Sequence, residues 1–236
     1  MKRICFIALC ACLLNSLTTL CVWAQGSMTY VSSLSGPSGG SVAVASDSWF
    51  AQGFTTGTNA PGYSLESVSL LMANALGNPS GFTVSLYNDR GDRIFPGSSV
   101  VGTLSGSLAP VLVGTYSFMS SEPIILSPST GYFIVVTASQ LLTTGSYRWN
   151  YMAPSTNPPF YVTDGWHLGL QAMSSNGSVW ERVGGSTING GHFQFSIDAT
   201  AIPEPSSLAL VLCGGALWLA GRGRRRNGGA VKYPVP

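Results

Sequence analysis

The sequence predicts an all-β fold, an antiparallel β-sandwich of jelly-roll type, flanked by an N-terminal signal peptide and one short C-terminal membrane helix. In the central region, Phe82–Tyr87 and Phe193–Asp198 alternate apolar with polar side chains, the pattern of strands that bury one face. Turn sequences such as Asn78-Pro79-Ser80-Gly81 and Asn189-Gly190-Gly191 separate such stretches at short intervals. Many short strands with frequent turns and no long helical stretch are typical of a sandwich.

The strands expected in chain order are rich in β-branched and aromatic residues and are bounded by turn formers. Besides the two alternating stretches, they are Trp49–Thr55, Val100–Leu104, Gly114–Phe118, Ile124–Leu126, Tyr132–Val136, Tyr147–Tyr151, Tyr161–Thr163 and Ser178–Arg182. The continuous apolar run Tyr132–Val136 indicates a strand that is covered on both faces.

One segment fits two kinds of structure. Leu65, Val68, Met72 and Leu76 would share one face of a helix, whereas Val68, Leu70 and Met72 would share one face of a strand. The glycines and prolines on both sides of the segment favour the strand.

Residues 1–24 have the features of a signal peptide. Lys2 and Arg3 give the positive start, and Ile4–Leu14 is an apolar stretch of eleven residues that precedes the expected cleavage after Ala24. This stretch is too short for a spanning helix, which needs about 20 apolar residues. A lipoprotein signal is the alternative, because Leu9-Cys10-Ala11-Cys12 loosely matches a lipidation site.

The central domain, residues 25–202, is expected to end before Pro203, because proline cannot continue a strand ladder. Pro203-Glu204-Pro205 predicts a stiff, exposed break, and the apolar run Ser206–Gly221 follows it. After that run comes the cluster Arg222, Arg224, Arg225 and Arg226, which would stay on the cytoplasmic side of a membrane.

The apolar run is a marginal membrane anchor. Its sixteen residues would span about 24 Å at about 1.5 Å per residue, whereas the hydrocarbon core is about 30 Å thick. A short anchor suits a segment that is used transiently and then cut away, and a permanent short membrane helix is the alternative. Residues 203–226 are therefore interpreted as a sorting and anchor segment, and residues 227–236 as a disordered extension.

Charge and cysteine content exclude several classes of function. Residues 25–202 contain four arginines, no lysine and eight acidic residues, a net charge of −4, so the basic face that a nucleic-acid partner needs is not expected. The five cysteines all lie outside this region, which excludes a disulfide framework, a cysteine nucleophile and a thiolate metal site within it.

The tail resembles the PEP-CTERM sorting signal of Gram-negative bacteria, which combines a Pro-Glu-Pro triplet, a short membrane segment and an arginine-rich end. The matching residues are Pro203, Glu204 and Pro205, and then Arg222, Arg224, Arg225 and Arg226. The resemblance implies an exosortase-type membrane peptidase as partner and a transient contact with the membrane. It also implies an inner-membrane-anchored intermediate, final delivery to the cell envelope or beyond, and a setting of exopolysaccharide and biofilm.

The domain is similar to the choice-of-anchor R family of exported β domains. The similar stretches are Trp49–Gly57, Tyr63–Val68, Gly81–Tyr87, Gly114–Phe118 and Ser146–Asn150. That family is named for its varied anchors, so the resemblance implies a location and carries over no catalytic residue.

Several short motifs resemble functional sites, but ordinary structure is the favoured interpretation of each. Gly36-Pro37-Ser38-Gly39-Gly40 fits G-x-S-x-G but has loop-like flanks in place of the strand and helix of a nucleophile elbow. Arg90-Gly91-Asp92 is expected to be a turn, and Asn88, Asp89 and Asp92 offer three of the six to eight oxygens that Ca²⁺ prefers. An enzyme would need His167 or His192 beside an acid and a hydroxyl in a cleft. No catalytic, cofactor-binding or metal site is therefore predicted.

The aromatic side chains of the second half are the best candidates for ligand contact, because flat rings stack on sugar faces. They are Trp149, Tyr151, Tyr161, Trp166 and Trp180. Core packing is the favoured interpretation for most of them, while Tyr161 and Trp166 flank an Asp-Gly turn and are expected to be exposed.

The sequence thus predicts an exported, non-enzymatic surface or matrix protein of structural or adhesive function. A carbohydrate-binding module that uses exposed aromatics is the alternative.

Overall fold

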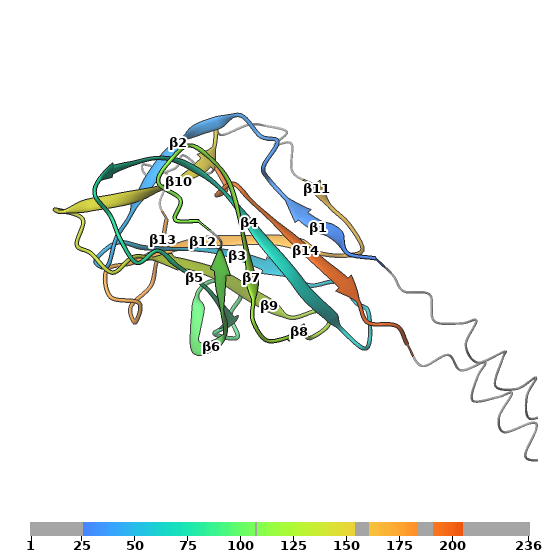
Figure 1. The fold of residues 1–236 in the computed structure, drawn as a ribbon. Helices are drawn as coiled ribbons and strands as arrows, with labels where there is room; N and C mark the ends of the chain where they lie inside the picture. Colours follow the sequence, from blue (N-terminus) through green and yellow to red (C-terminus); the bar gives the residue numbers. More distant parts are fainter. Residues whose placement is uncertain (1–25, 107, 154–160, 184–190, 205–236) are drawn as a thin grey trace, which may run out of the picture. The chain divides into compact units, whose positions relative to one another are not determined.

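The computed structural model describes residues 26–106, 108–153, 161–183 and 191–204, and the regular structure in these ranges consists of β-strands (Figure 1). The expected signal peptide and membrane segment lie outside the described residues. The strands are β1 Met28–Ser32, β2 Ser38–Val44, β3 Trp49–Thr55, β4 Tyr63–Gly77, β5 Thr83–Asp89, β6 Pro96–Gly106, β7 Gly114–Ser120, β8 Ile124–Leu126, β9 Gly131–Thr137, β10 Gly145–Met152, β11 Tyr161–Val162, β12 His167–Ser174, β13 Glu181–Arg182 and β14 Phe195–Ala201.

The described strands form one curled sheet in which neighbouring strands run antiparallel. Its order is β11-β1-β14-β4-β7-β6-β5-β9-β3-β12-β13, with β8 and β10 added to β4, and β2 added to β10. The compact unit that contains them runs from Gln25 to Ile202. The prediction of an all-β, antiparallel fold is confirmed.

The curl brings the two halves of the sheet onto one core. Inward side chains of β4 and β14, among them Leu70 and Ile197, share a hydrophobic cluster with Leu86 of β5 and Ile134 of β9. In Figure 1, β4, β7 and β14 pass in front of β3, β9 and β12. The side chains of this cluster come from both groups of strands. Close packing of such a core is the main source of stability in a domain without disulfides.

Strand β9 is covered on both faces, as its continuous apolar sequence predicted. Tyr132, Ile134 and Val136 belong to the main core. Phe133 and Val135 point the other way, into a smaller cluster that includes Ala51 of β3. The period-two geometry of a strand explains this division.

The ambiguous segment is a strand, and it is the longest in the described sheet. Strand β4 has fifteen residues and pairs with β14, β7, β8 and β10 along its length. Val68, Leu70 and Met72 are fully buried on one face, while Leu76, which the helical pattern would have buried, is exposed.

The structure contains three strands that were not predicted, and one predicted strand is shorter than expected. β1, β2 and β12 were not predicted, because their sequences are short or interrupted by glycine, as at Gly39-Gly40 and Gly169. The expected strand Ser178–Arg182 is wrong for its first three residues, since only Glu181–Arg182 pairs with β12. At that end Asn176 Oδ1 accepts the N–H groups of Ser178 and Val179, which makes a turn.

Candidate functional site

The end of β14 leads directly into the expected sorting triplet. The ladder ends at Ala201, which pairs with Tyr63, and the N–H of Ile202 donates to the carbonyl of Gly62 at 3.0 Å. Pro203 and Glu204 follow, both exposed and without regular structure. Pro205, Arg222, Arg224, Arg225 and Arg226 lie outside the described residues.

Asn59 holds the chain at this point, which we call the C-terminal exit (residues 201–204). Its Nδ2 donates to the carbonyl of Ile202 at 3.0 Å and to the carbonyl of Gly62 at 2.5 Å. Because Asn59 and Gly62 belong to the turn before β4, this turn ties the exit to the start of the longest strand. The role of Asn59 was not predicted. The sequence Asn59-Ala60-Pro61-Gly62 nevertheless has the composition of a turn that an asparagine side chain closes.

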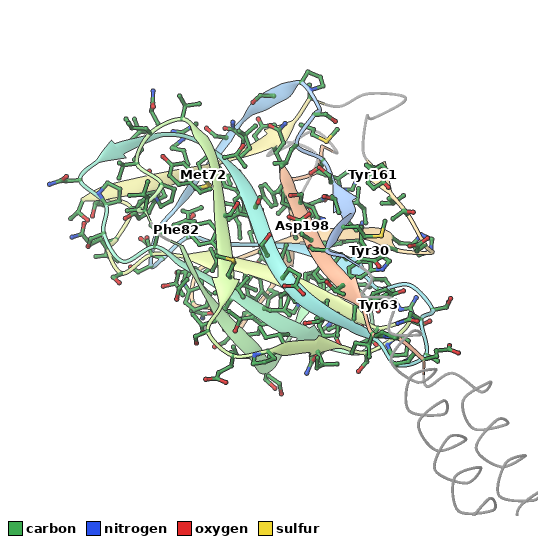
Figure 2. The ribbon with its side chains drawn as sticks, turned by 45° about the vertical axis from the view of Figure 1, so that its right-hand side comes forward. Tyr30, Tyr63, Met72, Phe82, Tyr161 and Asp198 are labelled. Carbon is green, nitrogen blue, oxygen red and sulfur yellow. The ribbon has the colours of Figure 1, made fainter. Side chains whose placement is uncertain are left out.

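A depression of about 630 Å³ opens beside the exit. Tyr30, Tyr63, Asn59, Asp164 and Ala201 are among the residues that line it. Burial, and after it the charge of Asp164 and the neighbouring Tyr63, raises the pKa of Tyr30. Figure 2 shows Tyr30 and Tyr63 together at this end of the domain.

Trp166 lies beneath this depression and is not exposed, so its expected exposure is wrong. It is 1% exposed, with its ring stacked on Tyr30 at 4.8 Å and on Phe54 at 5.7 Å, and edge-on to Tyr63 at 5.0 Å. The turn before it explains why. Asp164 and Gly165 both have positive φ, and the N–H of Trp166 donates to the carbonyl of Thr163 at 2.9 Å. This tight turn joins β11, which pairs with β1, to β12, which pairs with β3, and it returns the chain to the sheet with the indole on the core side.

Tyr161 is exposed, as expected, but it has no exposed aromatic partner among the described residues. Its exposed fraction is 51%, whereas Trp149 is fully buried and Tyr151 and Trp180 are half-buried. A sugar-binding platform would need two or more rings exposed in one plane. The described residues therefore do not supply the feature that the carbohydrate-binding alternative requires.

The two histidines line a second depression, of about 340 Å³, together with Arg93. Nε2 of Gln171 hydrogen-bonds to Nδ1 of His192, and burial lowers the pKa of His192 below its ordinary value. No carboxylate is among the described residues that line this depression. The acid–histidine pair that general acid–base chemistry would need is not formed there by these residues.

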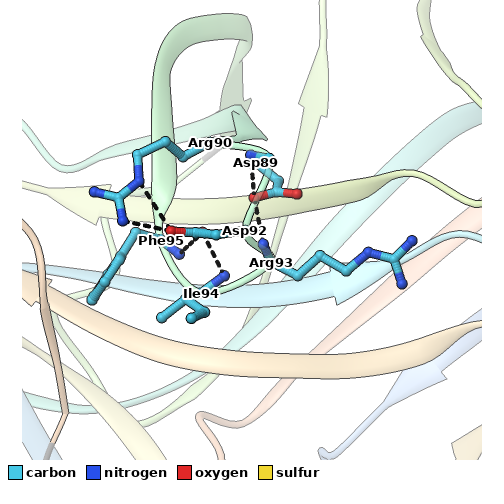
Figure 3. A network of polar contacts seen from close by, with 7 residues as sticks. Asp89, Arg90, Asp92, Arg93, Ile94 and Phe95 are labelled. Carbon is cyan, nitrogen blue, oxygen red and sulfur yellow. Dashed lines mark hydrogen bonds and ion pairs between the residues drawn. The ribbon is translucent and has the colours of Figure 1, made fainter.

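The Asp89–Phe95 turn is held together by its own two aspartates (Figure 3). Oδ1 of Asp89 accepts the N–H groups of Gly91 and Arg93 at 2.9 and 2.8 Å, and Oδ1 of Asp92 accepts the N–H of Ile94 at 2.8 Å. The other oxygen of Asp92 forms an ion pair with Arg90 at 2.5 Å. The backbone N–H of Ile94, followed by Arg90, lowers the pKa of Asp92. The interpretation of Arg90-Gly91-Asp92 as a turn is confirmed, and its carboxylates are occupied by donors within the turn.

Ser38 is not at a nucleophile elbow. It begins strand β2. Its hydroxyl donates to the carbonyl of Gly40 at 3.4 Å and accepts the N–H of Gly40 at 3.3 Å. The loop expected over Gly36–Gly40 is thus partly a strand, paired with β10.

Two further findings apply to the described residues only. Within them, no three His, Cys, Asp or Glu side chains are grouped closely enough to hold a metal ion. The same ranges contain no helix with the length and apolar character to cross a membrane.

Comparison with known proteins found no family model that matches the chain and no significant match among curated proteins.

Proposed function

We propose that this chain is an exported, non-enzymatic protein of the cell surface or extracellular matrix, sorted through its C-terminal tail. An exosortase-type membrane peptidase would recognise Pro203-Glu204-Pro205, while Ser206–Gly221 and Arg222, Arg224, Arg225 and Arg226 hold the chain in the inner membrane. The released domain, a jelly-roll-like sandwich, would then act structurally or adhesively among exopolysaccharide.

The C-terminal exit is the observation that carries this proposal. The last ladder pair, Ala201 with Tyr63, and the bonds that hold Ile202 are complete before the triplet begins. A cut at the triplet would therefore remove no core side chain and no ladder hydrogen bond. The exposure of Pro203 and Glu204 also leaves the first two residues of the triplet accessible to a peptidase.

The test follows the size and location of an epitope-tagged full chain in cells with and without the sorting peptidase. The triple variant Pro203→Ala/Glu204→Ala/Pro205→Ala should stay at the larger size in the membrane fraction, as the unaltered chain should in cells that lack the peptidase.

The matched control is Glu122→Ala/Pro123→Ala, which removes an exposed Glu-Pro pair between β7 and β8. This control should be processed like the unaltered chain. A triple variant of unchanged size and location would reject the proposal.

A further inference from the structure

The end of the domain opposite the C-terminal exit exposes a group of aliphatic side chains. We call this group the apolar tip, and its members are each between 45% and 71% exposed: Leu76, Leu108, Leu112, Val113, Leu141 and Leu142. Monomeric soluble proteins rarely expose large contiguous apolar patches, and such patches mark interaction sites.

Backbone contacts bring the three segments of the tip together. On one side of β4, the N–H of Ala75 donates to the carbonyl of Val111 at 2.9 Å, and the N–H of Val113 donates to Oδ1 of Asn74 at 2.8 Å. On the other side, Gly77 pairs with Gly145, directly after the turn in which Thr144 N–H donates to the carbonyl of Leu141. Leu76 therefore lies between the β6–β7 loop (residues 108–113) and the β9–β10 turn (residues 141–144).

The tip is almost without charge. The segments 67–88, 94–121 and 123–147 contain no charged residue. The charged side chains beside the tip are Asp47, which accepts the N–H of Leu142 at 2.9 Å, and Arg148, whose guanidinium donates to Ser41. Loops that insert into lipid surfaces usually add lysine or arginine, and the tip segments have neither.

A hollow lies next to the projecting loop. It has a volume of about 480 Å³ and is bordered by Leu108 and Pro110 of the β6–β7 loop. Phe82, Phe118 and Tyr147 also line it, and the ring of Phe82 lies 5.6 Å from that of Phe118 and 4.9 Å from that of Tyr147. One surface thus carries an apolar projection beside a recess of mixed lining, in which Thr83, Thr103 and Ser105 accompany the aromatic rings.

We propose that the apolar tip pairs with the apolar tip of a second copy of this chain. A projection beside a recess is complementary in shape to a second copy of itself, which is what a two-fold symmetric interface requires. In the pair, the β6–β7 loop of each copy fills the hollow of the other. The six tip side chains expose roughly 600 Å², most of the roughly 800 Å² per partner that a standard interface buries.

The position of the tip makes such pairing compatible with a tethered tail. Strand β4 runs from Tyr63 at the C-terminal exit to Gly77 at the tip, a distance of about 45 Å at about 3.3 Å per residue. Figure 2 shows Tyr63 and Phe82 toward opposite ends of the domain. The tip and the exit therefore lie at opposite ends of β4, and pairing at the tip uses no residue of the exit.

The experiment uses the full chain in intact cells, with Cys213 replaced by serine and one cysteine added. Because residues 25–202 contain no cysteine, a short bismaleimide should link Leu112→Cys chains into a covalent dimer. The matched control is Ile125→Cys, an exposed aliphatic position (52%, against 65% for Leu112) that pairs with Ser64 near the exit, and it should give no dimer.

A second substitution tests whether the tip itself drives the contact. Leu108→Asp, at a side chain 71% exposed, should reduce the Leu112→Cys dimer at least about 10-fold, because each dimer loses two buried leucines. Ile125→Asp should leave the dimer unchanged. The proposal is overturned by a lack of covalent dimer, by equal dimer from Ile125→Cys, by persistence of the dimer in Leu108→Asp, or by adducts with a different protein only.

The pairing and the sorting proposals fail separately. The Leu112→Cys dimer should also form in the Pro203→Ala/Glu204→Ala/Pro205→Ala chain, whose processing is the readout of the sorting proposal. A dimer without processing would reject sorting alone, and processing without a dimer would reject tip pairing alone.

Discussion

Two buried tryptophans differ in one hydrogen bond, and this difference predicts unequal effects of the same substitution. Nε1 of Trp149 donates to the carbonyl of Gln194 at 3.0 Å. Nε1 of Trp166 has no hydrogen-bond partner among the described residues, although the side chain is only 1% exposed. Replacing each with phenylalanine removes similar volume from the core, so the indole N–H decides the difference.

The difference in free energy of unfolding between the two variants follows from what each indole N–H contributes to stability. Trp149→Phe loses one hydrogen bond, about 1 kcal/mol, and the Gln194 carbonyl still accepts the N–H of Leu71 at 3.0 Å. Trp166→Phe instead removes a buried donor whose lack of a partner costs about 1–3 kcal/mol. We therefore expect Trp149→Phe to lower the free energy of unfolding by about 2–4 kcal/mol more than Trp166→Phe does.

Equilibrium urea unfolding, followed by far-UV circular dichroism, measures this difference. With a slope of about 2 kcal/mol per molar urea, the two midpoints should differ by at least about 1 M. Tyr161→Phe, at an exposed ring, is the control and should stay within about 0.5 kcal/mol of the unaltered chain. Equal midpoints for the two tryptophan variants, or a lower midpoint for Trp166→Phe, would refute the reasoning.

Three further predictions concern the exit and two titratable groups. Asn59→Ala removes two donated hydrogen bonds, so amide exchange at Ile202 should become roughly 10-fold faster or more; unchanged exchange would show that the asparagine does not hold the exit. The lowered pKa of Asp92 means that its contribution to the turn is present above the ordinary value of 3.8 and is lost as the pH falls through the lower folded-state value. NMR titration should place this carboxyl below 3.8, and the Ile94 amide should exchange faster in Asp92→Asn. Because burial lowers the pKa of His192, the unfolded chain binds a proton more readily, so the free energy of unfolding should fall as the pH drops below 6.5. His192→Gln should flatten that part of the pH profile, and an unaltered profile would count against burial as the cause.

Strand positions were predictable where side-chain alternation and burial agree. In β14 every second residue enters the core, and in β5 Val84 and Leu86 do, so the apolar pattern alone locates these strands. β2 and β12 could not be found in this way, because Gly39, Gly40 and Gly169 contribute no side chain to the pattern. Gly169 is needed where it is, since a Cβ there would lie 2.7 Å from the backbone of Gly53.

The candidate site was predictable in part. The proline of the triplet indicated where the ladder ends, because proline cannot take part in it, and the last paired residue is Ala201. The prediction that Trp166 is exposed is wrong, because a residue next to a turn can still point its side chain into the core. The direction of a side chain after a tight turn depends on which strands pair with the segments on either side of it, here β1 with β11 and β3 with β12, and that information is not local in sequence. The role of Asn59 depends on a contact 143 residues away in the chain.

Strand β14 lies between β1 and β4 and is bonded to both along its length. Tension applied at Ile202 along the axis of this strand would load the hydrogen bonds on both of its sides. The hydrogen bonds on its two sides would then be sheared simultaneously instead of being opened one after another, as in a peeled hairpin. A domain carried on this strand is thus suited to withstand mechanical load at the very end by which it would be tethered.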